Sequence, residues 1–173
     1  SVAVGGTNLI FTMAAMTVID KIGRRALLLV GSVGTAGCMF LVASQFYAAS
    51  MSGNLVLIGL LGFIAFFAMS QGVVIWVFIS EIFPNRVRSK GQSLGTFTHW
   101  AMAALVSWVF PVVADAAAGH AFAFFGLMMV LQFFFAWKIL PETMGKSLEE
   151  LEADLGLGTE ELEELEQQAA ESG

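Results

Sequence analysis

The sequence predicts an all-α membrane protein with five transmembrane helices. Hydrophobic residues make up 57% of its 173 residues and charged residues only 13%, whereas ordinary globular domains carry about 25% charged residues. No Asp, Glu, Lys or Arg occurs between Ala26 and Ser80. A soluble core cannot hide so long an uncharged stretch, whereas a bilayer needs about 20 apolar residues for each spanning helix.

Five apolar segments follow one another along the transmembrane part, residues 1–140. Their expected ranges are 2–19, 26–47, 55–79, 93–114 and 119–140. Backbone amides in lipid must be satisfied within each segment, so these segments are expected to be helices. The alternating polarity of barrel strands is absent from the sequence.

Glycines and short charged hinges punctuate the first three segments. Residues 20–25 separate the first segment from the second. The next two segments carry closely spaced small residues that let membrane helices pack together: Gly31, Gly34, Gly37, Gly59 and Gly62. Gly72, two turns before the third segment ends, is expected to loosen that helix or to admit a ligand.

The later segments are bounded by charge as well. The third segment ends in a hinge that contains Glu81, Pro84, Arg86, Arg88 and Lys90. The fifth ends near Lys138 and Pro141. All eight basic residues therefore lie in the first hinge, the third hinge or the exit of the fifth segment. This odd–even split predicts, by the positive-inside rule, a cytoplasmic C-terminus.

Residues 141–173 are expected to form a cytoplasmic acidic tail. Ten of the fourteen acidic residues lie from Glu149 onward, so the rest of the chain is net positive. Ser147 and Glu150 fit a capping box, and Leu148, Leu151 and Leu155 fall on one face of a short amphipathic helix. No nucleic-acid partner is implied. Ser1 is no natural start, so the chain is expected to belong to a longer polypeptide whose N-terminal helices are its partners.

Few polar or aromatic side chains lie inside the apolar segments. Asn8, Gln71, His99 and Gln132 are the notable polar ones, and a buried amide usually bonds a neighbouring helix. Trp76 and Trp100 lie several residues inside their segments, where stacking on a sugar's C–H face is possible. Trp108 and Trp137 lie nearer the segment ends and are interpreted as interfacial or packing residues.

The sequence shows no pattern of catalysis or metal binding. His99, His120 and Cys38 have no ligand spacing, so no metal and no cofactor are predicted. No nucleophile lies beside a base, which argues against an enzyme. His99 invites a proton-relay interpretation, but with no acid in its segment a neutral, hydrogen-bonded histidine is favoured.

The charged hinges suggest ion pairs at the cytoplasmic helix ends. Glu81 is expected to pair with Arg24 or Arg25, and Arg88 with Asp20. Losing one partner of a partly buried pair is costly. If such pairs form in only one conformational state, they bias the equilibrium between states and act in gating. The alternative is a static orientation signal.

Three motifs resemble those of the sugar porter family in the major facilitator superfamily. Residues 20–25 resemble its D-x-x-G-R-R hinge, residues 80–91 its S-E-x-F-P-x-x-x-R-x-x-G hinge, and residues 141–150 its P-E-T-x-G-x-x-L-E-E exit motif. The resemblance covers the chain to about residue 155. Their order places the chain as helices eight to twelve of a twelve-helix fold, a partial major-facilitator fold.

The resemblance implies a monosaccharide transporter that works by alternating access. The family's sugar-contacting positions fall on Asn8, Trp76, His99 and Trp100, with His99 where the family usually has asparagine or glutamine. The family's tenth helix often has prolines before the tryptophan, which are missing here, and a common glutamate is Ala68. The seventh helix, with a sugar-binding glutamine pair, and the first, with the symporters' proton-coupling acid, lie outside the chain.

Three functions remain open from the sequence. The favoured one is a proton-coupled sugar symporter of a bacterial inner membrane, with H⁺ as coupling ion and the lipid bilayer as its surroundings. A facilitative sugar or polyol carrier is the first alternative, and it differs in surviving collapse of the proton gradient. A transporter-like nutrient receptor is the second, and it requires a long signalling tail, which this chain lacks.

Overall fold

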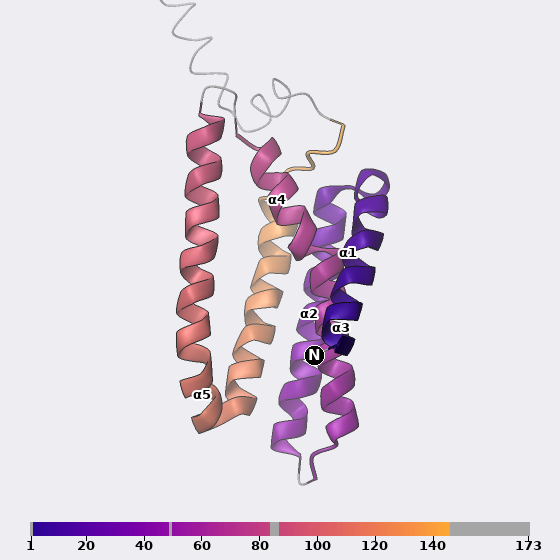
Figure 1. Cartoon of the computed structure of the whole chain (residues 1–173), viewed down its shortest axis with the longest axis vertical. Coiled ribbons are helices and arrows are strands. Elements are labelled where there is room, and N and C mark those ends of the chain that lie inside the picture. Colours follow the sequence, from indigo (N-terminus) through magenta and orange to yellow (C-terminus); the bar gives the residue numbers. More distant parts are fainter. Residues whose placement is uncertain (1, 49, 84–86, 146–173) are drawn as a thin grey trace, which may run out of the picture.

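The computed structural model describes residues 2–48, 50–83 and 87–145. The helices are α1 (Val2–Ile22), α2 (Arg24–Tyr47), α3 (Gly53–Met69), α4 (Gln71–Glu81) and α5 (Arg88–Lys138) (Figure 1). No strand occurs among these residues, so the predicted all-α class is confirmed. α1, α2, α3 with α4, and α5 are each long and apolar enough to cross a membrane. The predicted tail helix at Ser147 lies outside the described residues.

α5 is two antiparallel helices joined at a break. Ala117 has φ −160° and ψ 64°, which is not helical. The chain reverses direction there, so residues 88–116 and residues 118–138 run side by side in opposite directions (Figure 1). The break falls in the sequence region expected to form a hinge, 115–118. With α3 and α4 taken as one span, the described chain crosses the bundle five times.

The third crossing is broken at Ser70. This residue has φ −119° and ψ −88°, and it ends α3 and begins α4. Its hydroxyl donates to the Phe66 carbonyl at 2.7 Å, and its buried side chain packs against Gly31 of α2. The expected loosening at Gly72 is therefore wrong in position, because Gly72 lies within α4. The serine hydroxyl competes for a helix carbonyl two residues earlier.

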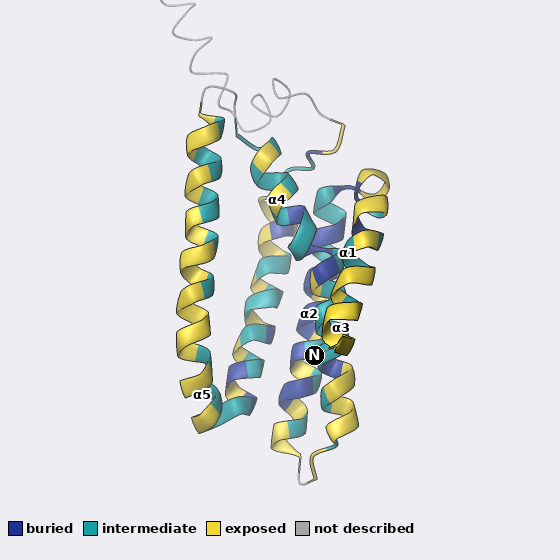
Figure 2. Ribbon diagram, in the orientation of Figure 1, coloured by how far each residue is buried: buried dark blue, intermediate teal, exposed yellow. Residues whose placement is uncertain are grey.

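α2 is the centre of the structure. It contains most of the buried residues, and its most extensive contacts are with α5 and α3 (Figure 2). Near the charged end, Leu27 and Leu28 of α2 pack with Ile19, Val74 and Ala136. These five residues come from α1, α2, α4 and α5, so this core joins the helix ends that lead into the three charged hinges.

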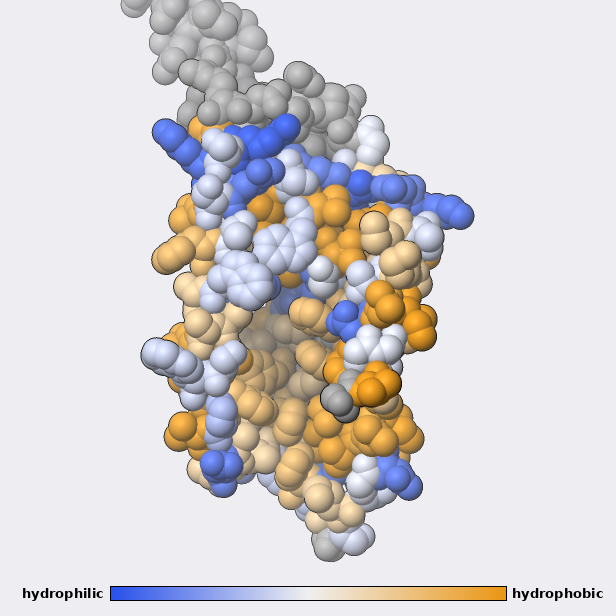
Figure 3. Space-filling view, viewed as in Figure 1, coloured by the Kyte–Doolittle hydropathy of each residue, from blue (hydrophilic) through white to orange (hydrophobic). Residues whose placement is uncertain are grey.

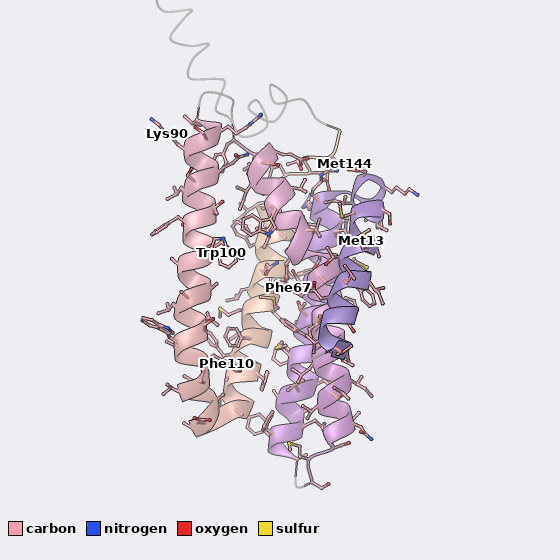
Figure 4. The ribbon with its side chains drawn as sticks, in the orientation of Figure 1. Met13, Phe67, Lys90, Trp100, Phe110 and Met144 are labelled. Carbon is pink, nitrogen blue, oxygen red and sulfur yellow. The ribbon has the colours of Figure 1, made fainter. Side chains whose placement is uncertain are left out.

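The charged hinges gather at one end of the bundle. The α1–α2 hinge, the α4–α5 connection and the chain after α5 all lie at the upper end in Figure 1, where hydrophilic residues form a band in Figure 3. Lys90 and Met144, labelled in Figure 4, mark this end. The two connections without basic residues lie at the opposite end. The positive-inside pattern is thus an arrangement in space as well as in sequence.

The first half of α5 is covered least. All the buried residues of α5 belong to its second half, and Trp108 in the first half is 83% exposed (Figure 2). In Figure 3, a hollow opens between this half-helix and α1. Helices α4 and α5 therefore leave side chains uncovered beside the hollow.

Candidate functional site

Three of the predicted site residues form an aromatic triad, Trp76, His99 and Trp100. The ring centroids of Trp76 and His99 are 5.0 Å apart at an interplanar angle of 67°, and those of His99 and Trp100 are 5.5 Å apart at 87°. Both contacts are edge-to-face, the geometry that aromatic quadrupoles favour. The imidazole is thereby held between an indole from α4 and an indole from its own helix.

The local sequence explains why Trp76 is available. Val74, two residues earlier on α4, is fully buried in the core. Two residues on a helix are about 200° apart, so a helix that buries Val74 turns Trp76 away from the core. Trp76 is accordingly 38% exposed. The break at Ser70 sets where this helix begins and hence where its indole meets α5.

The triad offers the chemistry of a sugar site. Trp100 is 62% exposed, and Figure 4 shows it on the first half of α5 beside the hollow of Figure 3. No described residue hydrogen-bonds a ring nitrogen of His99, which is only partly buried. Flat indole surfaces next to unused donor and acceptor nitrogens suit a ligand with a C–H face and peripheral hydroxyls.

Asn8 is not brought into the triad by any contact in the structure. It lies exposed on α1, and its side chain makes no hydrogen bond to another described residue. Its assignment as a sugar ligand remains a prediction.

The larger cavities are chemically unsuited to a sugar. One of about 370 Å³ lies among α2, α3, α4 and α5, and Gln71 is the one polar residue among the described residues that line it. That amide is buried and donates to the Met129 sulfur at 3.5 Å. A cavity of about 470 Å³ between the halves of α5 is lined by apolar side chains and His120. Walls of this kind leave hydroxyls unpaired.

A second cluster, the hinge network, joins the charged helix ends. Arg24 donates from Nε to Glu81 Oε2 at 3.2 Å and from Nη2 to Glu81 Oε1 at 2.9 Å. Such a two-point contact fixes the orientation of both groups. The Thr143 hydroxyl, which is buried, donates to Glu81 Oε2 at 2.6 Å. Glu81 at the end of α4 is thus tied both to α2 and to the chain beyond α5.

Arg24 also contacts Asp20. Its Nη1 lies 3.1 Å from Asp20 Oδ1, across one turn of the α1–α2 hinge. The expected partner of Asp20 was Arg88, whose Nε instead donates to the Phe83 carbonyl at 3.3 Å. Asp20 and Arg24 are four residues apart on consecutive turns, so local geometry favours their pairing.

Glu142 and Arg25 form reciprocal helix caps. Glu142 accepts hydrogen bonds from the backbone amides of Arg24, at 2.9 Å, and Arg25, at 3.1 Å, at the start of α2. Arg25 in turn donates to the carbonyls of Ala136, at 3.2 Å, and Trp137 in the last turn of α5. An acid at a helix start and a base at a helix end are both favourable to the helix dipole.

Gly23 makes the Glu142 cap possible. It has φ +93°, a conformation that costs glycine little, and a Cβ here would lie 2.6 Å from Glu142 Oε2. Sequence reasoning missed Glu142 and Thr143 as members of the hinge network. The available signal was the exit motif itself, in which these two residues follow Pro141.

Comparison with known proteins gives consistent results. A family model for "Sugar (and other) transporter" matches residues 1–155. The D-xylose-proton symporter of Escherichia coli is 41% identical over 160 residues, which cover 88% of this chain and 32% of that protein. The arabinose-proton symporter of Bacillus subtilis is 37% identical over 150 residues, which cover 86% of this chain and 32% of that protein.

Solved structures show the same relationship. The inward-open xylose transporter XylE from E. coli matches with a TM-score of 0.81 and 43% identity over 87% of this chain and 34% of that one. A structure of the proton:xylose symporter XylE bound to 6-bromo-6-deoxy-D-glucose also has a TM-score of 0.81, with 42% identity over 88% of this chain and 33% of that one. The predicted partial major-facilitator fold is confirmed. The chain spans about a third of these relatives' length.

Proposed function

The chain belongs to the sugar transporter family, and from this premise we propose that it is the C-terminal part of a secondary transporter that moves a monosaccharide across a membrane by alternating access. The observation that carries the proposal is the aromatic triad of Trp76, His99 and Trp100, open beside a hollow at mid-bundle. Members of this family are transporters and not enzymes.

Each triad residue has a role in this proposal. Trp76 and Trp100 stack on the sugar ring, and His99 exchanges hydrogen bonds with a hydroxyl. Asn8 supplies a further amide from α1. A cavity that is completed by helices outside this chain then excludes water from these contacts, which strengthens each polar interaction. The relatives named above are symporters of D-xylose and arabinose, so pentoses are the first substrates to test.

Helix α4 links binding to movement in the proposed cycle. Trp76 and Glu81 are five residues apart on one helix, which is about 7.5 Å along its axis. The backbone break at Ser70 frees this short helix from α3. A tilt of α4 that closes Trp76 on a sugar therefore also moves Glu81 against Arg24. The hinge network biases the equilibrium between states because it is complete in only one of them.

We propose proton symport with the charged hinges and the C-terminus on the cytoplasmic side. The gathering of basic residues at one end of the bundle supports this orientation. Two proton symporters among the relatives support the coupling. A polyol carrier remains the second candidate, since a probable polyol transporter of Arabidopsis thaliana is 37% identical over 156 residues.

Uptake by the full-length polypeptide in liposomes tests this function. An inward proton gradient is expected to drive labelled D-xylose above its equilibrium level, and a protonophore is expected to abolish that accumulation. Labelled glucose and a polyol are run in parallel to separate the substrate classes. Equilibration that the protonophore leaves unchanged would show a facilitative carrier, and saturable uptake of none of these substrates would contradict the proposed function.

A further inference from the structure

His99 is the one triad residue whose hydrogen-bonding capacity changes with pH. A neutral imidazole presents one donor and one acceptor, as an amide side chain does, whereas an imidazolium presents two donors and no acceptor. Histidine makes this change between pH 5 and 8. A histidine in a sugar site therefore differs from asparagine or glutamine in exactly one respect, its response to protons.

The structure fixes the ring while leaving its nitrogens unused. Two indoles hold the imidazole at centroid distances of 5.0 Å and 5.5 Å, both nearly perpendicular to it. Among the described residues no side chain or backbone group bonds either nitrogen. Rotation to find another partner is restricted by the indoles, so the nitrogens remain available to a ligand.

The charged groups of the elements around the triad are distant or engaged. On α4 the acid is Glu81, five residues beyond Trp76, and it pairs with Arg24 of α2. On α5 the nearest bases are Lys90 and Arg88, nine and eleven residues before His99, or roughly 13 Å or more along the helix axis. Asp115 lies sixteen residues after His99, near the opposite end.

We infer that protons and sugar compete for His99, so that acid weakens sugar binding at this site. This inference rests on the proposed function and adds its regulation. With no carboxylate beside the ring to neutralise an imidazolium, the sugar binds the neutral form and uses its lone pair as an acceptor. A proton on that nitrogen removes the acceptor, and by linkage sugar affinity falls as pH is lowered through the histidine's titration range.

The test is equilibrium binding of D-xylose and D-glucose to the purified full-length protein at about pH 5.5 and about pH 7.5, on either side of histidine's ordinary range. The ratio of the two dissociation constants is compared between wild type and His99→Gln. We expect the ratio to be about threefold or more larger for wild type than for His99→Gln. Comparing ratios cancels the effect of protons bound elsewhere, such as at the coupling acid.

Two further variants make the result specific. His99→Asn supplies a second uncharged amide and is expected to behave as His99→Gln. His120→Gln removes the chain's other histidine, which contacts Tyr47 at 5.4 Å near the opposite end, and is expected to keep the wild-type ratio. Equal ratios in wild type and both His99 variants would overturn this inference alone. No sugar binding by wild type at either pH would overturn the proposed function and this inference with it.

Discussion

Replacing Glu81 with glutamine is expected to lower the stability of the transporter by about 2 kcal/mol and its uptake rate by about tenfold. The side chain of Arg24 is only 12% exposed, and that of Glu81 is 29% exposed. Removing one charge leaves the other partly buried without its two-point partner. A fully buried broken pair costs about 3–5 kcal/mol, and the partial exposure of Glu81 places it below that range. The measurement is the melting temperature in detergent together with labelled-sugar uptake.

Asp20→Asn is the matched control for Glu81→Gln. Asp20 also contacts Arg24, but its side chain is 74% exposed, and exposed pairs contribute about 0–1 kcal/mol. We expect its melting temperature to stay close to wild type. Arg24→Met with Glu81→Met removes both charges and is expected to recover stability but not the rate. Equal losses for Asp20→Asn and Glu81→Gln would contradict the special role given to Glu81.

Replacing Gly31 with alanine is expected to destabilise the protein by about 3 kcal/mol, at the upper end of typical overpacking. A Cβ at Gly31 would lie 1.8 Å from Ser70 Oγ and 2.2 Å from Ser70 Cβ. Contacts so short force α2 away from the break between α3 and α4. The break is where α4 begins, so the position of Trp76 should be disturbed as well. The melting temperature and sugar affinity measure these two effects.

Gly37→Ala provides the control on the same helix. A Cβ at Gly37 meets nothing within 4 Å, and its substitution is expected to change stability by less than about 0.5 kcal/mol. Combining Gly31→Ala with Ser70→Gly removes the atoms in conflict and should restore part of the lost stability. Similar melting temperatures for Gly31→Ala and Gly37→Ala would show that α2 does not press on the break.

Much of the fold follows from patterns that are local in sequence. Uncharged segments of about twenty residues predict membrane helices, and basic residues in alternate hinges predict which helix ends share a side. The break at Ser70 has no such pattern. Ser70 was not distinguished from other serines because its effect depends on Gly31, which lies on another helix and leaves room for the buried hydroxyl.

The two clusters differ in how far the sequence predicts them. Tryptophans well inside apolar segments point to Trp76 and Trp100 because interfacial depth does not explain them. The choice between Arg24 and Arg25 as partner of Glu81 could not be made, since the two are adjacent. Only the packed structure separates them, with Arg24 facing α4 and Arg25 reaching the end of α5. The Glu142 cap joins residues 118 positions apart, beyond any local pattern.

Calorimetric titration of the purified full-length protein with D-xylose tests the aromatic triad most directly. The triad predicts that Trp100→Ala weakens sugar binding about tenfold or more, because stacking on an aromatic ring is lost. Trp108→Ala, an equal truncation eight residues along the same helix at a residue that is 83% exposed, should bind as wild type does. Equal affinities for wild type and Trp100→Ala would contradict the account.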